Sequence, residues 1–359
     1  MLIQWITIAE FRNYRSLSFH PEPGLNVLSG PNAQGKTNLL EAMGVLLVGR
    51  SFRGAKTVDL PFWGAPAVSL CGCVVRGDVE REIRRGISQR EDGGWIVTGE
   101  ACAWARAIPF GWQDLAILTG GPQARRNFID GFAAKVQPAH LAAHSRYRQV
   151  LGRRNHLLQR GHLEQLAPWD EQLATIGVEI LGRRRRAVAA LETEVSTLYP
   201  EMAGADYRVR LEYRSALAPE VTEAEFLEAL SRRRDDERRR GLTLVGPHRD
   251  DLVVELDGRD MRSFGSRGQQ RLLVLALRLA EAGPVASAVG SSPILLLDDA
   301  LSELDLDVQR RVLRHIAGSG QVFLTTAEPG LPEGSGAAWW DVKGGTVAES
   351  MGVVVGGAG

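Results

Sequence analysis

The stretch that decides the fold is Val27-Leu28-Ser29-Gly30-Pro31-Asn32-Ala33-Gln34-Gly35-Lys36-Thr37-Asn38-Leu39-Leu40. Its centre fits the pattern G-x-x-x-x-G-K-[ST], in which x is any residue, between an apolar strand and an apolar helix. The two glycines let the backbone turn around a phosphate, and the amides at the helix N-terminus point at the anion. We therefore predict a nucleotide site in which Lys36 reaches the β- and γ-phosphates and Thr37 ligates Mg²⁺. The simpler alternative is an ordinary glycine-rich turn.

A second apolar run, Ile294-Leu295-Leu296-Leu297, ends in the paired carboxylates Asp298 and Asp299. Such a run is typical of a buried parallel strand, and a carboxylate at its C-terminal end lies beside the phosphate loop in α/β sheets. Adjacent side chains of a strand point in opposite directions. We therefore assign Asp298 to Mg²⁺ and Asp299 to the γ-phosphate and its attacking water. Two acids on a surface loop are the alternative.

The pattern of the whole chain predicts one α/β sheet built from both ends of the sequence, with a mostly helical block inserted between them. The elements expected at the two ends are strands at 3–9, 17–28, 294–298 and 321–326, hairpins between 68 and 97, and helices at 38–48, 269–282 and 305–317. The elements expected in the block are helices from 123 to 198 bounded at Pro138 and Pro168, a strand at 207–211, a helix at about 220–240, and strands at 242–245 and 252–256. We expect a discontinuous head, residues 1–120 and 241–359, and an inserted domain at 121–240.

The composition excludes several classes of protein. The 359 residues are 44% hydrophobic and 24% charged, which is typical of a globular protein rather than a disordered or fibrous one. Three cysteines cannot form a disulfide framework, and Cys71 and Cys73 lack a second pair that would complete a zinc site. The apolar stretch 272–289 contains Arg278 and Glu281, so we interpret it as a buried helix and not as a membrane span. We therefore expect a cytoplasmic protein with reduced thiols.

Basic residues are concentrated between Arg125 and Arg160, where Asp130 is the only acid, although Lys+Arg and Asp+Glu are both 43 overall. A segregated positive face suits phosphates without recognition of bases, so we predict DNA binding there. Solvated helix faces are the alternative. The run 183–186 is a weaker candidate because acids flank it. The predicted DNA-binding residues are Arg125, Arg126, Lys135, Arg146, Arg148, Arg153, Arg154 and Arg160.

Ser266, Gly268 and Gln269 stand at the expected start of a helix, where a hydroxyl and backbone amides can bind an anion. An N-capped helix is the plainer interpretation, but the segment lies shortly before the paired aspartates. That order resembles the ABC-type ATPases, in which the signature S-G-G-Q of one subunit closes over the nucleotide of the other. The same resemblance implies a D-loop at residues 302–305 and a Q-loop glutamine at Gln113.

Several longer segments resemble the RecF family of bacterial recombination mediators. They lie at residues 11–14, 24–42, 121–130, 246–252 and 268–271, so the resemblance covers nearly the whole chain. It implies an ATP-dependent homodimer with a head similar to that of SMC proteins but without their long coiled coil. It also implies binding to double-stranded DNA or to single/double-strand junctions. The family's role is to help load RecA at gapped DNA, together with RecO and RecR.

Two positions depart from the ABC pattern. Many ABC ATPases have Glu where this chain has Asp299, which is one methylene shorter. A shift of about 1 Å in such a group can cost on the order of 10²-fold in rate. We therefore expect a weak, DNA-linked ATPase whose slow hydrolysis acts as a timer. No His follows the expected strand 321–326; Thr325 and Thr326 stand at that switch position, where a hydroxyl could contact the γ-phosphate.

The predicted fold class is an α/β ABC-ATPase (P-loop NTPase) head with an antiparallel β subdomain and an inserted helical domain. The predicted catalytic residues are Asp299, Lys36, Ser266 and Gln113, and the predicted metal ligands are Thr37, Asp298 and Gln113. The predicted nucleotide-binding residues are Gly30, Pro31, Asn32, Ala33, Gln34, Gly35, Lys36, Thr37, Asn38, Arg12, Asn13, Ser266, Gly268 and Gln269. The alternatives are the ATPase subunit of a transporter, a P-loop phosphotransferase and an SMC-like chromosome protein head. The long insertion disfavours the first, the signature the second, and the absence of heptads the third.

Overall fold

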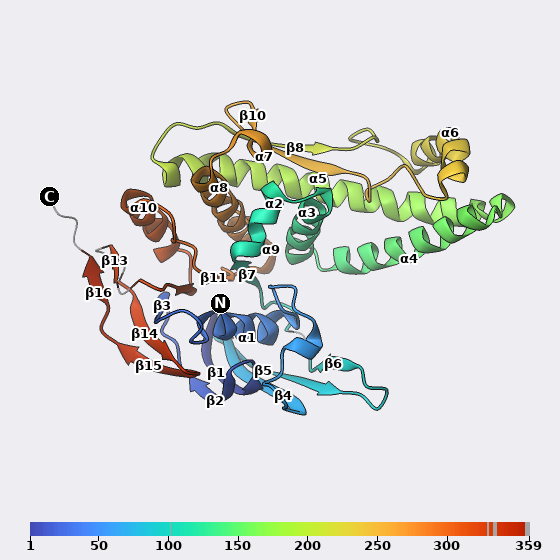
Figure 1. The fold of residues 1–359 in the computed structure, drawn as a ribbon. Helices are drawn as coiled ribbons and strands as arrows, with labels where there is room; N and C mark the ends of the chain where they lie inside the picture. The colour runs from blue at the N-terminus through green and yellow to red at the C-terminus, as the bar shows by residue number, and fades with distance from the viewer. Residues whose placement is uncertain (101, 329, 333–335, 356–359) are drawn as a thin grey trace. The chain divides into compact units, whose positions relative to one another are not determined.

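We describe a computed structural model that covers the chain except residues 101, 329, 333–335 and 356–359. The chain divides into two compact units (Figure 1). Unit 1 comprises Met1–Leu115, Leu198–Asp206 and Arg267–Gly359, and unit 2 comprises Ala116–Thr197 and Tyr207–Ser266. The second boundary differs from the predicted one, because residues 241–266 group with the helical unit. Strand β9 (Asp251–Leu256) pairs there along its whole length with β8 (Val209–Arg214).

Unit 1 contains a six-stranded sheet of order β15-β14-β3-β12-β11-β7. Its strands are β3 (Leu25–Ser29), β7 (Ala107–Phe110), β11 (Ile294–Leu297), β12 (Val322–Thr325), β14 (Ala338–Lys343) and β15 (Thr346–Ser350). All neighbours pair in parallel except β14 and β15. Every residue of β11 and β12 is buried, as expected for strands covered on both faces. The predicted strands near 294 and 321 are confirmed.

Unit 1 also contains a five-stranded antiparallel sheet of order β2-β1-β4-β5-β6. Its strands are β1 (Leu2–Phe11), β2 (Tyr14–Phe19), β4 (Ala67–Arg76), β5 (Val79–Gln89) and β6 (Trp95–Thr98), so the predicted hairpins are confirmed. The predicted strand 17–28 is wrong, because β2 and β3 are separate strands. Pro21 and Pro23 interrupt the run, and a proline cannot donate a ladder hydrogen bond.

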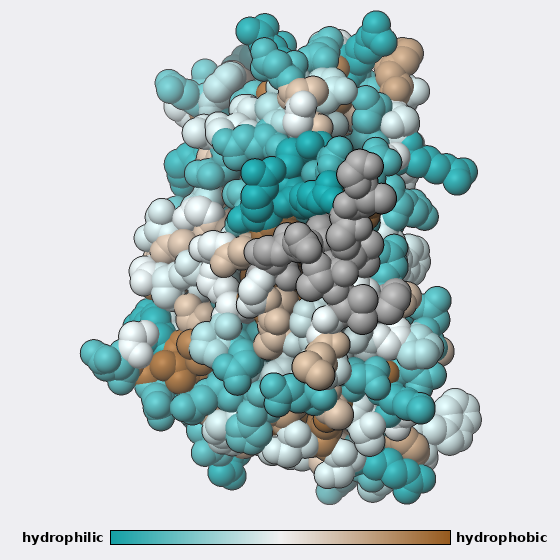
Figure 2. All heavy atoms as spheres, turned by 90° about the vertical axis from the view of Figure 1, so that its left-hand side faces the viewer, coloured by the Kyte–Doolittle hydropathy of each residue, from teal (hydrophilic) through white to brown (hydrophobic). Residues whose placement is uncertain are grey.

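Helix α1 (Lys36–Val48) packs against strands of the six-stranded and of the five-stranded sheet. Its buried Leu39, Leu40 and Leu46 share one hydrophobic core with Ile6 of β1 and Phe323 of β12. The two sheets therefore hold the helix, and with it the loop that precedes it, through a common core. On the face drawn in Figure 2, hydrophilic side chains predominate and hydrophobic ones gather in small groups.

The C-terminal helices of unit 1 are α8 (Arg267–Leu279), α9 (Ala282–Val289) and α10 (Leu306–Ala317). The predicted helix at 269–282 corresponds to α8, which ends at Leu279, and α9 is a separate helix that begins at Ala282. Within the part of the chain that the structure describes, the stretch Arg267–Val289 is the one segment with the length and composition of a membrane span, and more than half of it is buried inside the protein. Arg278, at its centre, forms ion pairs with Asp114 (2.5 Å) and Glu281 (2.7 Å).

Unit 2 is built on α3 (Pro122–Val136), α4 (Ala139–Arg160), α5 (Ala167–Ala203) and α6 (Glu223–Arg240). Pro138 directly precedes α4 and Pro168 lies in the first turn of α5, where a missing N–H costs nothing. The core of this unit joins Tyr147 of α4, Ile180 of α5 and Phe226 of α6. A three-stranded sheet, β10-β9-β8, belongs to the same unit.

The predicted strand at 242–245 is wrong. Side chains, not a neighbouring strand, accept its backbone hydrogen bonds: Thr243 N donates to Asn155 Oδ1 and Leu244 N to Glu237 Oε1, both at 2.8 Å. The remaining short elements are η1 (Thr57–Asp59), η2 (Trp112–Leu115), α2 (Ala116–Thr119), η3 (Leu163–Gln165), β10 (Arg259–Asp260), α7 (Met261–Phe264), β13 (Gly330–Pro332) and β16 (Val353–Val355).

Candidate nucleotide-binding site

The loop 30–35 joins β3 to α1 and is braced by the turn between β1 and β2. Tyr14 Oη donates to the carbonyl of Gly35 at 3.0 Å, and Asn13 Nδ2 donates to the carbonyl of Gln34 at 3.1 Å. Gly35 has φ 116°, and a Cβ on it would lie 2.4 Å from Asn13 Nδ2, so only glycine fits here. Asn13 therefore lies behind the loop as a support.

Arg12 also supports the loop from behind. Its guanidinium forms a two-pronged ion pair with the fully buried Glu41 of α1, at 2.8 and 2.9 Å, and donates to the carbonyl of Asp59 at 2.6 Å. Neither Arg12 nor Asn13 lines the pocket described below. Direct contact of both residues with nucleotide therefore stays a prediction, and in the structure they fix the position of the loop and of α1.

The turn between β14 and β15 contacts the same loop. Gly344 N donates to Gln34 Oε1 at 2.9 Å, and Gly345 N donates to the carbonyl of Gln34 at 3.4 Å. Segments from both ends of the sequence thus hold Gln34. The backbone of the loop is shaped by its neighbours, which is the preorganisation that anion binding by amides requires.

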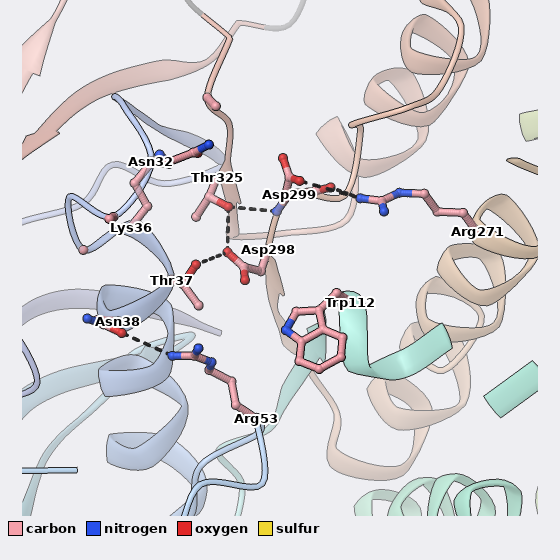
Figure 3. Close-up of a pocket in the computed structure, with 13 residues that line it drawn as sticks. Asn32, Lys36, Thr37, Asn38, Arg53, Trp112, Arg271, Asp298, Asp299 and Thr325 are labelled. Carbon is pink, nitrogen blue, oxygen red and sulfur yellow. Dashed lines mark hydrogen bonds and ion pairs between the residues drawn. The ribbon is translucent and has the colours of Figure 1, made fainter. Parts of the chain in front are cut away.

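The carboxylate of Asp298 lies beside Thr37, although the two are far apart in sequence. Thr37 Oγ1 and Thr325 Oγ1 each donate to Asp298 Oδ1 at 2.8 Å (Figure 3). The sheet order explains this contact, because β12, which ends at Thr325, lies between β3 and β11. Burial raises the pKa of Asp298, and the two hydroxyls oppose that shift. A cation at this carboxylate would offset the cost of its burial.

The hydroxyl of Thr325 is therefore engaged within the protein. It also accepts a hydrogen bond from Asp299 N at 2.8 Å, so one side chain fixes both aspartates. Thr325 lines the pocket, but Thr326 does not, and its hydroxyl accepts from Glu328 N at 3.0 Å. The expected contact of these hydroxyls with a γ-phosphate is not what the geometry favours. Thr325 positions the carboxylates instead.

Lys36 begins α1 and bends back over the loop. Its ammonium donates to the carbonyls of Gly30 (2.6 Å) and Pro31 (2.8 Å), which uses two of its three donors. Burial lowers the pKa of Lys36, while the charges of Asp299 and Asp298 oppose that shift. The positive charge of Lys36 is thus held over the loop and faces the position at which the loop would bind a phosphate.

Asp299 projects into the pocket from a strained backbone. Its φ is 51°, in the left-handed region, and its side chain is 59% exposed. Arg271 of α8 holds this turn: it donates to the carbonyl of Asp299 and to Ser302 Oγ. Figure 3 shows the guanidinium pointing at Asp299 from the helix. Sequence reasoning assigned Arg271 no role, although it ends the segment 268–271.

These side chains line one pocket of about 370 Å³. Trp112, 72% exposed, and Arg53 also line it and were missed, since neither belongs to a motif. Gln113, predicted as a metal ligand, does not line the pocket, and its Nε2 donates to the carbonyl of Phe52 at 3.4 Å. The lining residues are Asn32, Ala33, Gly35, Lys36, Thr37, Asn38, Arg53, Trp112, Arg271, Asp298, Asp299, Thr325 and Ala327.

The signature residues lie at the start of α8. Ser266 immediately precedes the helix, and both Ser266 and Gly268 are exposed. No atom lies within 4 Å of the place where a Cβ on Gly268 would be. None of the three signature residues lines the pocket of the same chain. Their exposed helix N-terminus is the kind of surface that can meet an anion held elsewhere.

The predicted basic face is smaller in the structure than in the sequence. Arg154 is fully buried, with ion pairs to Asp170 (2.6 Å) and Glu237 (2.7 Å), and Arg125 is 3% exposed and paired with Asp251 (2.6 Å). These two arginines are therefore removed from the predicted DNA-binding set, because partners in the core already neutralise them. The exposed members are Arg146, Arg148, Arg153 and Arg160, with Arg126 and Lys135 half-buried.

Among the described residues, no three His, Cys, Asp or Glu side chains gather as a metal site. The oxygens of Thr37 and Asp298 form a different kind of site. A hard cation such as Mg²⁺ prefers oxygen ligands and is commonly held by one or two protein groups together with substrate phosphates. The donor set therefore fits Mg²⁺ bound jointly with a nucleotide.

A phosphate loop, a neighbouring strand that ends in paired carboxylates, and a flanking antiparallel sheet define the head of an ABC-type ATPase. The chain belongs to the RecF family of DNA replication and repair proteins. Relatives with that description are 36% identical in Synechococcus sp. (strain JA-3-3Ab), covering 94% of each chain, and 39% identical in Moorella thermoacetica, covering 92% of this chain and 90% of the relative. A profile of the AAA domain matches residues 6–87.

Solved structures agree with this placement. One described as the recombination mediator protein RecF with ATP in the RecFOR pathway has a TM-score of 0.86 and 28% identity, and covers 97% of each chain. An SMC head bound to the C-winged helix domain of ScpA has a TM-score of 0.56 at 14% identity, covering 98% of this chain and 97% of that one. The second likeness concerns the fold alone.

Proposed function

We propose that this protein is an ATP-dependent, DNA-binding homodimer of recombinational repair. ATP with Mg²⁺ closes the dimer, and slow, DNA-linked hydrolysis reopens it, so that the protein acts as a timed clamp in the cytoplasm. Its partners are RecR, and RecO and RecA in the same pathway, and its task is to help load RecA at gapped DNA. Membership of the RecF family and the solved relative described with ATP in the RecFOR pathway support this proposal.

The nucleotide part of the proposal rests on the contact between Thr37 and Asp298. A hydroxyl after the P-loop lysine and a carboxylate at the end of β11 meet at 2.8 Å, with Lys36 above the same loop. Loop amides and Lys36 bind the phosphates, while Thr37 and Asp298 hold Mg²⁺, which would supply charge neutralisation at the β- and γ-phosphate oxygens. Asp299, aimed into the pocket, orients the attacking water.

The dimer part rests on the start of α8. The P-loop side of the pocket leaves a γ-phosphate open, and the exposed N-terminus of α8 offers donors that do not line the pocket of their own chain. A two-fold dimer brings each helix N-terminus to the partner's nucleotide. Each ATP then joins two subunits, and association is linked to nucleotide by mass action.

Sizing by light scattering tests the proposal in three states: without nucleotide, with ADP, and with ATP and Mg²⁺. We expect a dimer in ATP and weak association in ADP, because loss of the γ-phosphate removes the charge that α8 stabilises. A protein that stays monomeric in saturating ATP and Mg²⁺ would contradict the proposal.

Two variants at the start of α8 sharpen this test. Ser266→Arg should leave ATP binding to the monomer near normal and abolish both the dimer and hydrolysis. Gly268→Arg should do the same, since its Cβ meets open space in the monomer, and Gly268→Ala is the matched control that keeps both properties. ATP-dependent dimers of both arginine variants would show that α8 does not complete the partner's site.

Membership of the RecF family argues against the alternative functions that the sequence left open. A transporter subunit or a small-molecule phosphotransferase does not account for relatives matched over nine-tenths of the chain. The SMC heads share the fold at 14% identity, which assigns no chromosome-organising role.

A further inference from the structure

A second cavity lies entirely within unit 2, lined by residues of α3, α4 and α5 and by the loop 246–248. Its volume is about 420 Å³, within the range of small-molecule sites. Three arginines and two histidines line it, and among its described lining residues there is no carboxylate. A cavity of this size with cationic and neutral donors alone is suited to an anion.

Two residues of the lining, Tyr147 and His248, are joined in a chain of hydrogen bonds. Tyr147 Oη lies 2.8 Å from His248 Nδ1, and His248 Nε2 lies 3.0 Å from the carbonyl of Thr243. Because a carbonyl only accepts, Nε2 carries the proton and Nδ1 accepts from the tyrosine. Gly246 has φ 124°, and its Cβ would lie 2.5 Å from Tyr147 Oη, so the loop can approach only as glycine.

The carboxylates near the cavity are neutralised by other groups. Asp130 accepts from Arg184 Nε and Nη2, both at 2.7 Å, and lies 2.9 Å from His140 Nε2. Burial alone would raise the pKa of Asp130, but these hydrogen bonds more than offset it and lower the pKa. Asp251 is paired with Arg125 at 2.6 Å. Asp130 also forms an ion pair with His144 (3.3 Å), and the charges of Asp251, Asp250 and Asp130 partly offset that of Arg126, but none of these acids forms an ion pair with the other arginines of the lining.

Arg126 and Arg148 are those other arginines. Arg126 Nη1 donates to the backbone carbonyl of Asp250 at 2.8 Å, which positions the guanidinium without neutralising it. Arg148 is exposed at the mouth, and no carboxylate among the described residues forms an ion pair with it. Two guanidinium groups from different helices thus face one cavity. This arrangement matches a phosphate, whose oxygens accept from planar guanidinium forks.

We propose that this cavity binds the phosphate group of a nucleotide unit, held by Arg126 and Arg148, as a site separate from the P-loop. The apolar side chains of Leu151 and Ile180 line another part of the wall and leave room for the attached sugar or base. The same chemistry is present in a DNA strand and in a free nucleotide. Assigning the phosphate to DNA rests on the proposed function, whereas the cavity's affinity for phosphate does not.

The test uses the full-length Lys36→Met protein, in which we expect the P-loop not to engage phosphate, with ¹³C-labelled histidine rings. The chain has seven histidines, so its NMR spectrum is simple. It is titrated with inorganic phosphate, with dAMP, and with a short single-stranded oligonucleotide with and without a 5′-phosphate. We expect saturable shifts of the His144 and His248 signals, with dAMP tighter than phosphate because of the apolar wall.

Arg148→Ala should weaken dAMP binding about tenfold, the equivalent of one lost charge-assisted hydrogen bond. Arg186→Ala is the matched control, because Arg186 is exposed on α5 of the same unit but does not line the cavity. Equal dAMP affinity in the two variants, or shifts that do not saturate, would overturn the site.

The oligonucleotide arms separate this inference from the proposed function. Saturation by dAMP with no shift from either oligonucleotide would keep the site and assign it to a free nucleotide. Shifts from both oligonucleotides would assign it to DNA, and a preference for the phosphorylated one would assign it to a strand end. The protein could also bind the oligonucleotide without a shift of the His144 or His248 signal and fail to bind dAMP. That result would refute the site while leaving DNA binding intact.

Discussion

Single residues in the head carry roles that their sequence neighbours do not reveal. Thr325 is far from the P-loop in the chain, yet it ends the strand next to β3 in the sheet, and its hydroxyl bonds both to Asp298 and to the amide of Asp299. The sequence placed Thr325 at a switch position, but its support of the two aspartates was not predictable, because that role comes from the order of the strands. Asp298 and Thr37, in contrast, belong to sequence motifs that directly indicate a role in binding Mg²⁺.

Lys36→Met tests the phosphate loop. The ammonium bonds only to carbonyls of its own loop, at 2.6 and 2.8 Å, so we expect the fold to survive and ATP binding to be lost. Isothermal titration with ATP measures the binding, and circular dichroism checks the fold. ATP affinity equal to that of the native protein would contradict the assignment of the site.

Replacement by Asn should have different effects at Asp298 and at Asp299. Asp298→Asn removes a carboxylate that touches Thr37, so Mg²⁺-dependent nucleotide binding should weaken. Asp299→Asn leaves that contact in place, so binding should persist while hydrolysis slows and the ATP-bound dimer accumulates. Nucleotide affinity and single-turnover hydrolysis, measured for both variants, check this split. Equal loss of binding in both would show that the roles are not divided.

The titration of His248 should be visible in the stability of the protein. Burial lowers the pKa of His248 from its ordinary 6.5 to about 4. Between these values the unfolded chain binds the proton and the folded one does not, so stability falls as the pH drops below 6.5 and levels off below 4. The free energy of unfolding should fall by about 2 kcal/mol from this group between pH 7.5 and 5.

A comparison with His248→Gln isolates this effect. His144, whose pKa is also lowered, and Asp250, whose pKa is raised by burial, titrate in both proteins and cancel in the difference. Urea unfolding at the two pH values supplies the measurement. Parallel loss of stability in the native protein and in His248→Gln would mean that the ring is not held neutral.

At the scale of elements, helix α4 shows what periodicity can and cannot predict. Arg153 and Arg154 are adjacent and identical in type, but Arg153 is exposed whereas Arg154 is fully buried. The helix and its proline boundary were predictable. The burial of one arginine was not, because it depends on Asp170 and Glu237, which come from α5 and α6. Asp170 also pairs with Arg234, but Glu237 would lose its guanidinium partner in the core without Arg154, at a cost of about 3–5 kcal/mol.

The exposed arginines of α4 should carry DNA affinity. Replacing Arg146, Arg148, Arg153 and Arg160 with Glu should weaken DNA binding without changing ATP affinity. In the native protein, log affinity should fall with log salt concentration at a slope near −0.9 per duplex phosphate neutralised. Fluorescence anisotropy with a labelled duplex at several salt concentrations measures both quantities.

The matched control carries the same charge change on α6. There Arg232, Arg233 and Arg239 form ion pairs with acids of their own helix, and replacing them together with Arg238 should have a smaller effect on DNA binding. An unchanged salt slope in the α4 variant, or equal losses in both variants, would place the DNA elsewhere.

At the scale of the whole molecule, the strand, loop and helix around residue 30 and the apolar run before Asp298 were enough to predict the parallel sheet and its neighbouring motifs. The supports of the loop were not predictable. Asn13 and the turn at 344–345 meet at Gln34 from opposite ends of the chain, and such contacts depend on the tertiary fold. The grouping of residues 241–266 with the helical unit was not predictable for the same reason, since β8 and β9 pair although helix α6 separates them in the sequence.

A chain that ends at residue 337 tests this dependence on the last strands. It would lack β14, which pairs with β3, β15, which pairs with β14, and the turn between them, which contacts Gln34. We expect ATP binding to be lost in isothermal titration, although every motif of the pocket is still present. Native affinity in the shortened protein would show that the loop needs no support from the hairpin.

The central place of β3 in its sheet also matters while the protein is being made. β3 leaves the ribosome early, but the two strands that pair with it, β12 and β14, lie beyond residue 321. Until β12 and β14 have been synthesised, the apolar side chains of β3 lack both neighbouring strands, and exposed apolar surface of this kind is prone to aggregation and to chaperone binding. The nascent chain should gain affinity for ATP only after β14 has been synthesised. Incomplete chains released by stalled ribosomes would then not enter ATP-dependent dimers and would not inactivate them.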